Sequence, residues 1–290
     1  MRINPDTVNI DKVSTLEMVR KFNSEDKKVA EAVEGCLEAV AAAVDIMACA
    51  LSKGGRVIYI GSGTSGKLAV VDASECPPTF GVDDNMIIGI ISGGVEAVYG
   101  WKEETEDDEE LAVKDLRARN LNSGDVIVGI SASGNTPYVL SGLKFGSSIG
   151  CKTIGISCSN IGKLNGFADV NIVADVGPEV IEGSTRLKAG TAQKMILNML
   201  SSCTMIKLGK TYGNLMVNVK PINLKLKKRI IEIIMYAASC RKEAAVEALE
   251  KAGGNAKVAI TMLINGIDAE KAEELARKNE HKAQKAVEGD

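Results

Sequence analysis

Two short segments rich in glycine, serine and threonine stand directly after apolar runs, and their residue types suit the binding of an anion. Residues 61–66 read GSGTSG, and residues 131–136 read SASGNT. Glycine permits a positive φ and a close approach of the backbone to a ligand. The first N–H groups of a helix favour negative charge, and hydroxyl groups donate without adding charge. The segments predict a phosphate site with the candidate ligands Ser62, Thr64, Ser65, Ser131, Ser133, Asn135 and Thr136.

Neither segment completes a nucleotide-binding motif. Gly61, Gly63 and Gly66 fit G-x-G-x-x-G, but no acidic residue is evident about 20 residues further on, after a second strand. A Walker-type Gly-Lys-Ser/Thr is also missing, because Gly66-Lys67 leads into Leu68. The alternative is that both segments are only helix N-caps and turns. Their six hydroxyl groups, in two equivalent positions, favour a phosphoester site instead.

The elements around these segments alternate between strands and helices. Near-continuous apolar runs are typical of a parallel sheet that is buried on both faces and linked by right-handed crossovers. We therefore predict an α/β fold, a three-layer sandwich with helices on both faces of a parallel sheet. Both segments then lie at the strand ends where ligands bind in such sheets. The predicted strands are 57–60, 86–91, 126–130, 153–157 and 170–174. One predicted helix begins near residue 65, and three others span 103–117, 137–149 and 185–208.

The two ends of the chain predict helices only. Residues 15–53 have apolar positions at helical spacing, and strand signals disappear after about residue 222. The chain is therefore divided into an N-terminal helical segment that packs on the core (1–53), a central α/β domain (54–221) and a small helical C-terminal domain (222–290). The predicted C-terminal helices are 224–239, 242–251, 256–264 and 269–287.

The composition is that of an ordinary soluble globular protein. Its 290 residues are 45% hydrophobic and 25% charged, which predicts a sizeable core. A net charge of −3 gives no sign of nucleic-acid or membrane binding, and the short basic cluster at 225–229 fits a solvated helix face. No apolar run reaches the roughly 20 residues that span a bilayer. The polar start of the chain is unlike an export signal.

Histidine and cysteine usage narrows the chemistry. His281 is the only histidine, so proton transfer must fall to carboxylates, Lys, Tyr or Cys rather than to a zinc or histidine site. Seven scattered cysteines, an odd number, are expected to stay reduced in the cytoplasm. Cys76 has no histidine partner and precedes Pro77, so we expect it to pack rather than react.

Longer motifs resemble those of a known family. Residues 72–80 (DASECPPTF) and 183–194 (GSTRLKAGTAQK) resemble signatures of the N-acetylmuramic acid 6-phosphate etherases. Residues 13–18 (VSTLEM) and 213–217 (GNLMV) are similar to further family patterns. The paired Ser/Thr segments resemble those of the sugar isomerase (SIS) fold. The chain is thus identified as resembling this family, and its motifs are very specific.

The resemblance implies a lyase. Its reaction would cleave the D-lactyl ether at C3 of N-acetylmuramic acid 6-phosphate with water, giving N-acetylglucosamine 6-phosphate and D-lactate. It implies amino sugar catabolism and peptidoglycan recycling, a small-molecule sugar phosphate bound by an SIS domain at 54–221, and no metal or organic cofactor. The match extends from about residue 6 to residue 265, and Lys67 and Leu187 stand where the family has Arg and Met.

Two glutamates suit this chemistry. Ring opening makes C1 an aldehyde, so a base can remove the C2 proton while an acid protonates the lactyl oxygen. The family's acid matches Glu75, and its base matches Glu106, with Glu103 as the alternative. Glu75 ends an apolar helix that Pro77 should terminate, and a helix-end salt bridge is its alternative role. Glu106 lies in the charge run 103–110, which is otherwise typical of a solvated face.

The start of the long predicted helix 185–208 adds four candidates. Ser184 and Thr185 are expected to cap this helix and contact substrate. Arg186 and Lys188 are cations where the helix dipole disfavours them, so a phosphate or lactyl carboxylate partner is expected. Ion pairing at an interface is the alternative for both cations.

The spacing of these groups suggests a dimer. If 65–75 is one helix, Glu75 lies about 15 Å along its axis from the phosphate segment, which is longer than a hexose phosphate. We therefore expect a homodimer with the site near the interface, Glu75 serving the partner's pocket. Two alternatives remain on the same fold. One is a sugar-phosphate isomerase, and the other is a non-catalytic sugar-phosphate-binding regulator such as glucokinase regulatory protein, whose family carries two such domains.

Overall fold

The computed structural model describes residues 2–100, 103–219 and 224–278 and falls into two compact units. The expectations for His281 and for residues 279–287 lie outside the described residues. The domain boundaries at residues 53 and 221 stay predictions. The first unit is Met1–Ser74 with Asn85–Ser201, and the second is Glu75–Asp84 with Ser202–Asp290.

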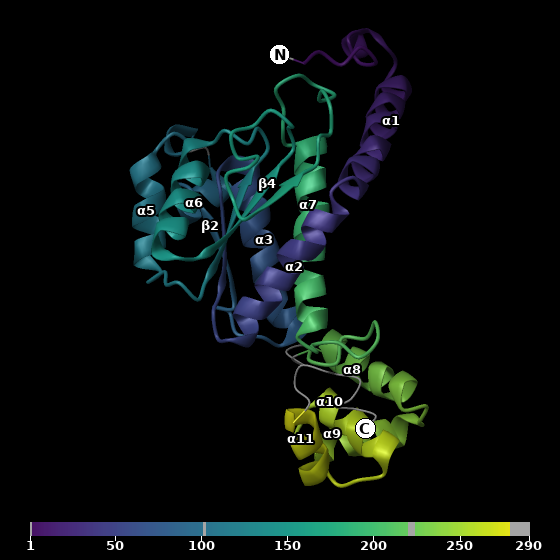
Figure 1. The fold of residues 1–290 in the computed structure, drawn as a ribbon. Helices are drawn as coiled ribbons and strands as arrows, with labels where there is room; N and C mark the ends of the chain where they lie inside the picture. The colour runs from purple at the N-terminus through teal and green to yellow at the C-terminus, as the bar shows by residue number, and fades with distance from the viewer. Residues whose placement is uncertain (1, 101–102, 220–223, 279–290) are drawn as a thin grey trace. The chain divides into compact units, whose positions relative to one another are not determined.

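A parallel sheet forms the centre of the first unit (Figure 1). Its strands are β1 (Val57–Gly61), β2 (Ile87–Ile91), β3 (Val126–Ser131), β4 (Lys152–Ser157) and β5 (Val170–Val173). The strand order is β2-β1-β3-β4-β5, and every pairing is parallel, which confirms the predicted sheet. All residues of β1 and β3 are buried, as expected for central strands with both faces covered.

Helices lie on both faces of this sheet, as predicted (Figure 1). α5 (Glu109–Ala118) and α6 (Pro137–Ile149) form one layer, in which α6 packs on β1, β3 and β4. The other layer contains α2 (Leu37–Ser52), which packs on β1, β3 and β5. It also contains α3 (Gly63–Phe80) and α7 (Lys188–Lys207), both of which continue into the second unit. The three layers bury the apolar strands on both sides.

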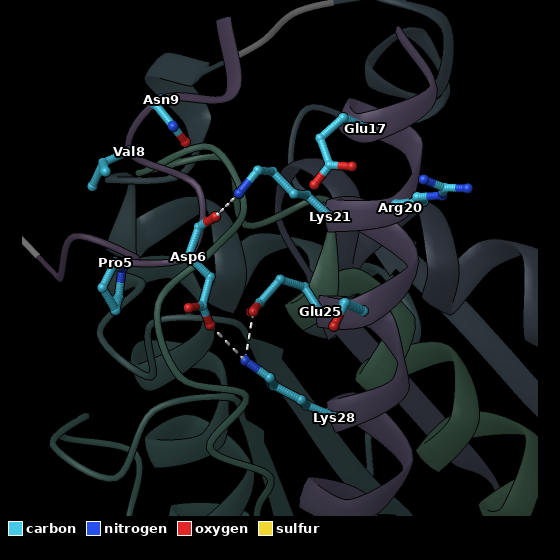
Figure 2. A pocket seen from close by; sticks show the side chains of 10 residues that line it. Pro5, Asp6, Val8, Asn9, Glu17, Arg20, Lys21, Glu25 and Lys28 are labelled. Carbon is cyan, nitrogen blue, oxygen red and sulfur yellow. Dashed lines mark hydrogen bonds and ion pairs between the residues drawn. The ribbon is translucent and has the colours of Figure 1, made fainter. Parts of the chain in front are cut away.

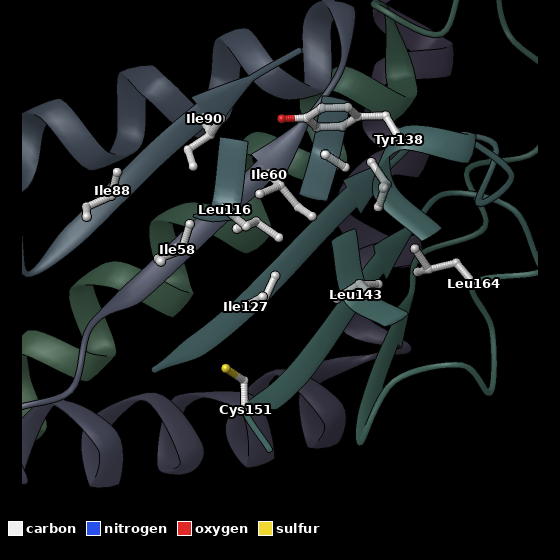
Figure 3. Close-up of a cluster of buried hydrophobic side chains, with 12 residues drawn as sticks. Ile58, Ile60, Ile88, Ile90, Leu116, Ile127, Tyr138, Leu143, Cys151 and Leu164 are labelled. Carbon is white, nitrogen blue, oxygen red and sulfur yellow. The ribbon is translucent and has the colours of Figure 1, made fainter. Parts of the chain in front are cut away.

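The core between the sheet and α6 holds the strands in register (Figure 3). Ile58, Ile60 and Ile127 meet Leu143 and Tyr138 there, and all five side chains are buried. A Cβ added to a glycine at 142 or 146 would clash with an isoleucine of the sheet, so these two small residues let α6 approach closely. The strand ends that bear the two Ser/Thr segments are therefore rigidly placed.

The strand order places both segments at one point of the sheet. β1 is followed by β2 on one side, and the chain then crosses to β3 on the other side of β1. The crevice at such a reversal is the usual ligand site of open α/β sheets. Gly61 pairs with Ile130 in the register, so the segments after β1 and β3 start at the same level on adjacent strands, about 5 Å apart.

The end of α3 and the predicted helix 103–117 both differ from the prediction. α3 does not end at the prolines but contains Pro77 and Pro78 and continues to Phe80. Each proline removes one N–H, yet the N–H of Gly81 donates to the carbonyl of Pro77 at 2.9 Å and closes the last turn. The predicted helix 103–117 is broken into a 3-10 turn η2 (Glu103–Thr105) and α5, because the Asp108 side chain caps α5 by accepting from the N–H of Leu111.

The remaining helices of the first unit are near the N-terminus and after β2. α1 (Thr15–Glu34) is capped by Ser14, whose side chain accepts from the N–H of Glu17 at 3.3 Å. η1 (Ile10–Lys12) precedes it, and α4 (Val95–Tyr99) follows β2. η1 and α4 are too short to show a periodic apolar face, so the sequence did not predict them.

The described part of the second unit is helical apart from its connections, as predicted. α8 (Leu224–Ala237), α9 (Lys242–Lys251), α10 (Ala256–Asn265) and α11 (Ala269–Lys278) follow one another. A buried cluster that includes Ile230, Ile234, Ala245 and Ile260 gives the unit its own core. It is therefore a helical bundle of the kind that the sequence predicts for the C-terminal part.

Two further features of the described residues are their lack of a single membrane-spanning helix and of disulfide bonds. No single helix there is long and apolar enough to cross a membrane. α1 and α2, which are bent by 60° at their junction, are long and apolar enough only when they are taken together. None of the seven cysteines, all of which lie in the described part of the chain, forms a disulfide bond.

Candidate functional site

The segment after β3 forms a hydrogen-bonded turn built on Ser131. The Ser131 hydroxyl accepts from the N–H of Gly134 at 3.0 Å and lies 2.8 Å from the hydroxyl of Thr136. Ser131 and Thr136 are buried, whereas Ser133 and Asn135 are exposed. The turn thus presents two of its predicted ligands to solvent and turns the other two inward.

Glu106 lies against this turn. The Thr136 hydroxyl donates to Oε1 of Glu106 at 3.1 Å, and the N–H of Tyr138 donates to the Glu106 carbonyl at 3.1 Å. The neighbouring Thr105 hydroxyl donates to the hydroxyl of Ser92, at the end of β2, at 3.0 Å. The structure therefore brings the predicted base to the second segment, although the charge run itself is typical of a solvated face. Glu103 begins η2, and its side chain lies outside the described residues.

The segment after β1 enters α3 at once. Ser62 is buried and its hydroxyl has no hydrogen-bond partner in the described part of the chain. The Ser65 hydroxyl donates to Oε1 of Gln193 at 3.0 Å, while the buried Nε2 of Gln193 has no partner there. Thr64 occupies the first turn of α3. Both atoms lie near the N-terminus of the 18-residue α3, whose dipole favours negative charge, so this end of the sheet has the donors that an anion needs.

The start of α7 differs from the prediction. α7 begins at Lys188, so Ser184 and Thr185 do not cap it. Instead the Glu179 carboxylate accepts from the N–H groups of Lys188 and Ala189, both at 2.9 Å. A carboxylate stabilises the N-terminus of a helix better than a hydroxyl because it also complements the dipole. Ser184 is half-buried, and Thr185 and Arg186 are exposed.

Lys188 is buried in an ion pair rather than exposed. Its Nζ lies 2.6 Å from Oε2 of Glu25 on α1, and the two side chains are 1% and 3% exposed. Lys28 contacts the other oxygen of Glu25. Burial raises the pKa of Glu25, but the hydrogen bonds from Lys188 and Lys28 outweigh it and hold the pKa at about 2. Lys188 is therefore paired within one chain and not at an interface, and Glu25 was not predicted because it is 163 residues away.

A second buried carboxyl group lies on α3. Asp72 is 5% exposed, and Oδ1 lies 3.2 Å from the hydroxyl of Ser201 on α7. Burial raises the pKa of Asp72 to about 6, against smaller opposing effects of Ser201, Lys194 and Tyr59. In the sequence, Asp72 stood out only as part of the motif 72–80. Its helical spacing with the apolar residues of α3 was the available signal that it faces the core.

Glu75, the predicted acid, opens the second unit. It lies on α3, and its side chain is exposed in this chain. Glu75 and the two Ser/Thr segments thus belong to different units. Cys76 beside it is buried, as expected for a packing residue.

A pocket lies between the N-terminal segment and α1, and all its lining residues come from positions 5–28 (Figure 2). Asp6, Lys21, Glu25 and Lys28 line it and contact one another: Lys28 lies 3.3 Å from the Asp6 carboxylate, and the Lys21 Nζ donates to the Asp6 backbone carbonyl at 2.6 Å. None of the predicted site residues lines it. Within the described residues, no group of three or more His, Cys, Asp or Glu side chains could hold a metal ion.

Family comparisons agree with this geometry. The model of the glucokinase regulatory protein N-terminal SIS domain matches residues 39–147, and that of the SIS domain matches residues 105–202. A phosphoheptose isomerase from Neisseria gonorrhoeae superimposes with a TM-score of 0.52 at 19% identity, over 66% of this chain and 99% of its own. A phosphoheptose isomerase from Francisella tularensis superimposes with a TM-score of 0.50 at 18% identity, over 67% of this chain and 100% of its own. These likenesses show the SIS fold.

Relatives of much higher identity cover nearly the whole chain. N-acetylmuramic acid 6-phosphate etherase from Clostridium beijerinckii is 50% identical over 98% of this chain and 93% of its own. The etherase from Serratia proteamaculans is 51% identical over 93% and 91%. That of Vibrio atlanticus is 47% identical over 98% and 93%.

Proposed function

The chain belongs to the N-acetylmuramic acid 6-phosphate etherase family, and from this membership we propose that it cleaves the D-lactyl ether of N-acetylmuramic acid 6-phosphate. It is an enzyme of the carbon–oxygen lyase class. The products are N-acetylglucosamine 6-phosphate and D-lactate, and the reaction serves amino sugar catabolism and peptidoglycan recycling. The observation that carries the proposal is the hydrogen bond between Glu106 and Thr136, which joins a carboxylate to a segment suited to phosphate.

The proposed reaction proceeds by elimination and then hydration. With the sugar ring open, Glu106 takes the proton from C2, the electron pair forms the C2–C3 double bond, and the C3–O bond to lactate breaks. Glu75 gives its proton to the departing oxygen. Glu75 then takes a proton from water, whose hydroxide adds at C3, while Glu106 returns its proton to C2. Both glutamates end in their starting protonation states.

The phosphate occupies the crevice between the ends of β1 and β3 in this proposal. The unpaired hydroxyl of buried Ser62 and the exposed Ser133 are the groups best placed to donate there. The free N–H groups of the α3 N-terminus add to them. The other residues proposed for the site, as ligands or as their supports, are Thr64, Ser65, Ser131, Asn135, Thr136, Ser184, Thr185, Arg186 and Lys188.

Two features complete the proposal. The enzyme forms a homodimer in which Glu75 serves the partner's pocket, which fits the exposure of Glu75 in this chain. It works in the cytoplasm, where seven cysteines that form no disulfide bond in the described residues stay reduced.

Release of D-lactate from N-acetylmuramic acid 6-phosphate tests the function. We expect turnover by the unmodified chain and its loss in Glu75→Gln and Glu106→Gln, both of which should still bind the substrate. Glu96→Gln, an exposed carboxylate on α4, is the matched control and should keep full activity. Interconversion of sugar phosphates without lactate release would instead support an isomerase. Binding without any turnover by the unmodified chain would support a regulator.

A further inference from the structure

We propose that Thr136 is a positioning residue, whose hydroxyl orients the Glu106 carboxylate instead of binding the substrate phosphate. This inference rests on the proposed function, because it gives Glu106 the role of base. It divides the segment after β3 into an inward pair, Ser131 and Thr136, and an outward pair, Ser133 and Asn135. The inward pair serves the base, and the outward side serves the ligand.

The direction of the hydrogen bonds supports this division. The N–H of Gly134 donates to the Ser131 hydroxyl at 3.0 Å, so one lone pair of Ser131 is occupied. Ser131 can then give its proton to Thr136 at 2.8 Å, which is closer than Ser133 at 3.4 Å. Thr136 in turn gives its single proton to Oε1 of Glu106 at 3.1 Å. A hydroxyl has only one proton, so Thr136 has none left for a phosphate oxygen.

Burial and backbone contacts point the same way. Thr136 is 6% exposed and Ser131 is 2% exposed, so neither hydroxyl is readily reached from solvent. The Glu106 backbone is held by Tyr138, at the start of α6. With its carbonyl fixed there and Oε1 fixed by Thr136, the Glu106 side chain is restrained at both ends. Its other oxygen, Oε2, has no hydrogen bond in the described part of the chain, which leaves it for the proton on C2.

The split between kcat and KM distinguishes a positioning residue from a phosphate ligand. In Thr136→Val we expect kcat to fall roughly 10- to 100-fold with KM unchanged, because a misplaced reacting group costs rate. Thr136→Ser keeps the hydroxyl and should restore kcat. Thr191→Val is the matched control: the Thr191 hydroxyl is exposed and donates to its own helix at Leu187, so kcat and KM should both stay the same. Ser133→Ala should raise KM instead.

A double variant tests whether Thr136 acts through Glu106. If it does, adding Thr136→Val to Glu106→Gln lowers the residual rate no further, because residues that act as a unit are not additive. A raised KM with unchanged kcat in Thr136→Val would overturn the inference and make Thr136 a phosphate ligand. Full activity in Glu106→Gln would instead overturn the base assignment of the proposed function. If Thr136→Val melts early, Thr136→Ala replaces it, since it removes the hydroxyl without adding a methyl group.

Discussion

The buried pair of Glu25 and Lys188 fixes the N-terminal helix to the start of α7. Both side chains are nearly unexposed, so removing one partner leaves a buried charge uncompensated. We expect Glu25→Gln to lower the free energy of unfolding at pH 7 by on the order of 3 kcal/mol, measured by urea unfolding. Lys28→Met removes a half-exposed cation and should cost much less. A double Glu25→Gln, Lys188→Met variant should recover part of the loss.

The pH dependence of this pair has a defined sign. The pKa of Glu25 is held at about 2, below its ordinary value of 4.5, so its ionised form stabilises the folded chain. This contribution is complete above pH 4.5 and is lost as the pH falls towards 2. The difference in unfolding free energy between the unmodified chain and Glu25→Gln should therefore shrink over that window. A constant difference would contradict the ion pair.

The pKa of Asp72 is raised and not lowered, so its contribution to stability changes with pH in the direction opposite to that of Glu25. Burial raises its pKa to about 6 from 3.8, so the folded state favours the protonated carboxyl, and this stability is lost as the pH rises through 6. Asp72→Asn mimics the protonated form and can donate to the Ser201 hydroxyl, which itself lies 3.0 Å from the carbonyl of Leu197. We expect it to raise the unfolding free energy at pH 8 by up to about 3 kcal/mol and to change nothing below pH 4. Exposed Asp26→Asn is the control; a lower stability of Asp72→Asn at pH 8 would contradict the assignment.

At the scale of elements, the approach of α3 to β1 and β2 depends on Gly66. A Cβ at this position would lie 2.6 Å from the carbonyl oxygen of Gly61 and 2.6 Å from Cγ1 of Ile91. Gly66→Ala should therefore push the N-terminus of α3 away from the sheet, costing about 1–3 kcal/mol in unfolding free energy and raising KM. Gly35→Ala is the control, since its Cβ would meet nothing closer than 3.5 Å. Equal effects of the two variants would show that the close contact is unimportant.

The sequence predicts elements well where local pattern decides them and poorly where distant contacts do. Apolar runs predicted all five strands, and α9 was predicted at its observed bounds, because burial of both strand faces and helical periodicity leave clear signals. α3 continues through two prolines because the hydrogen bond from Gly81 closes its last turn. The start of α7 depends on Glu179, nine residues before Lys188. Such partners are set by tertiary structure, which propensity alone does not contain.

The site follows the same rule. Both Ser/Thr segments could be predicted from residue types, since glycine and hydroxyl groups directly after apolar runs are typical of an anion-binding turn. The contact of Glu106 with Thr136 joins residues 30 positions apart across two connections of the sheet. No spacing rule reaches that far, and only the resemblance to a family selected Glu106 from its charge run. The unpaired Nε2 of Gln193 was likewise visible only in the folded chain.

At the scale of the whole molecule, the two proposed catalytic glutamates belong to different units of the chain. Glu75 is exposed, whereas a general acid works best where water is excluded. A second copy of the chain would supply that cover, and in a two-fold dimer each copy would give Glu75 to the other. The acid and the base of one site would then come from two chains, which makes the sites separable by mixing variants.

A purified heterodimer tests this arrangement directly. Co-expression of Glu75→Gln and Glu106→Gln with different tags gives a dimer in which one shared site has both glutamates, so we expect about half of the wild-type rate. A heterodimer of the unmodified chain with a chain carrying both substitutions should have no intact shared site and no activity. If each site lies within one chain, the two results are exchanged: the first heterodimer is inactive, and the second keeps half of the rate. Failure to isolate any heterodimer, with activity retained by a monomer, would contradict the dimer itself, because each site would then obtain both glutamates from one chain.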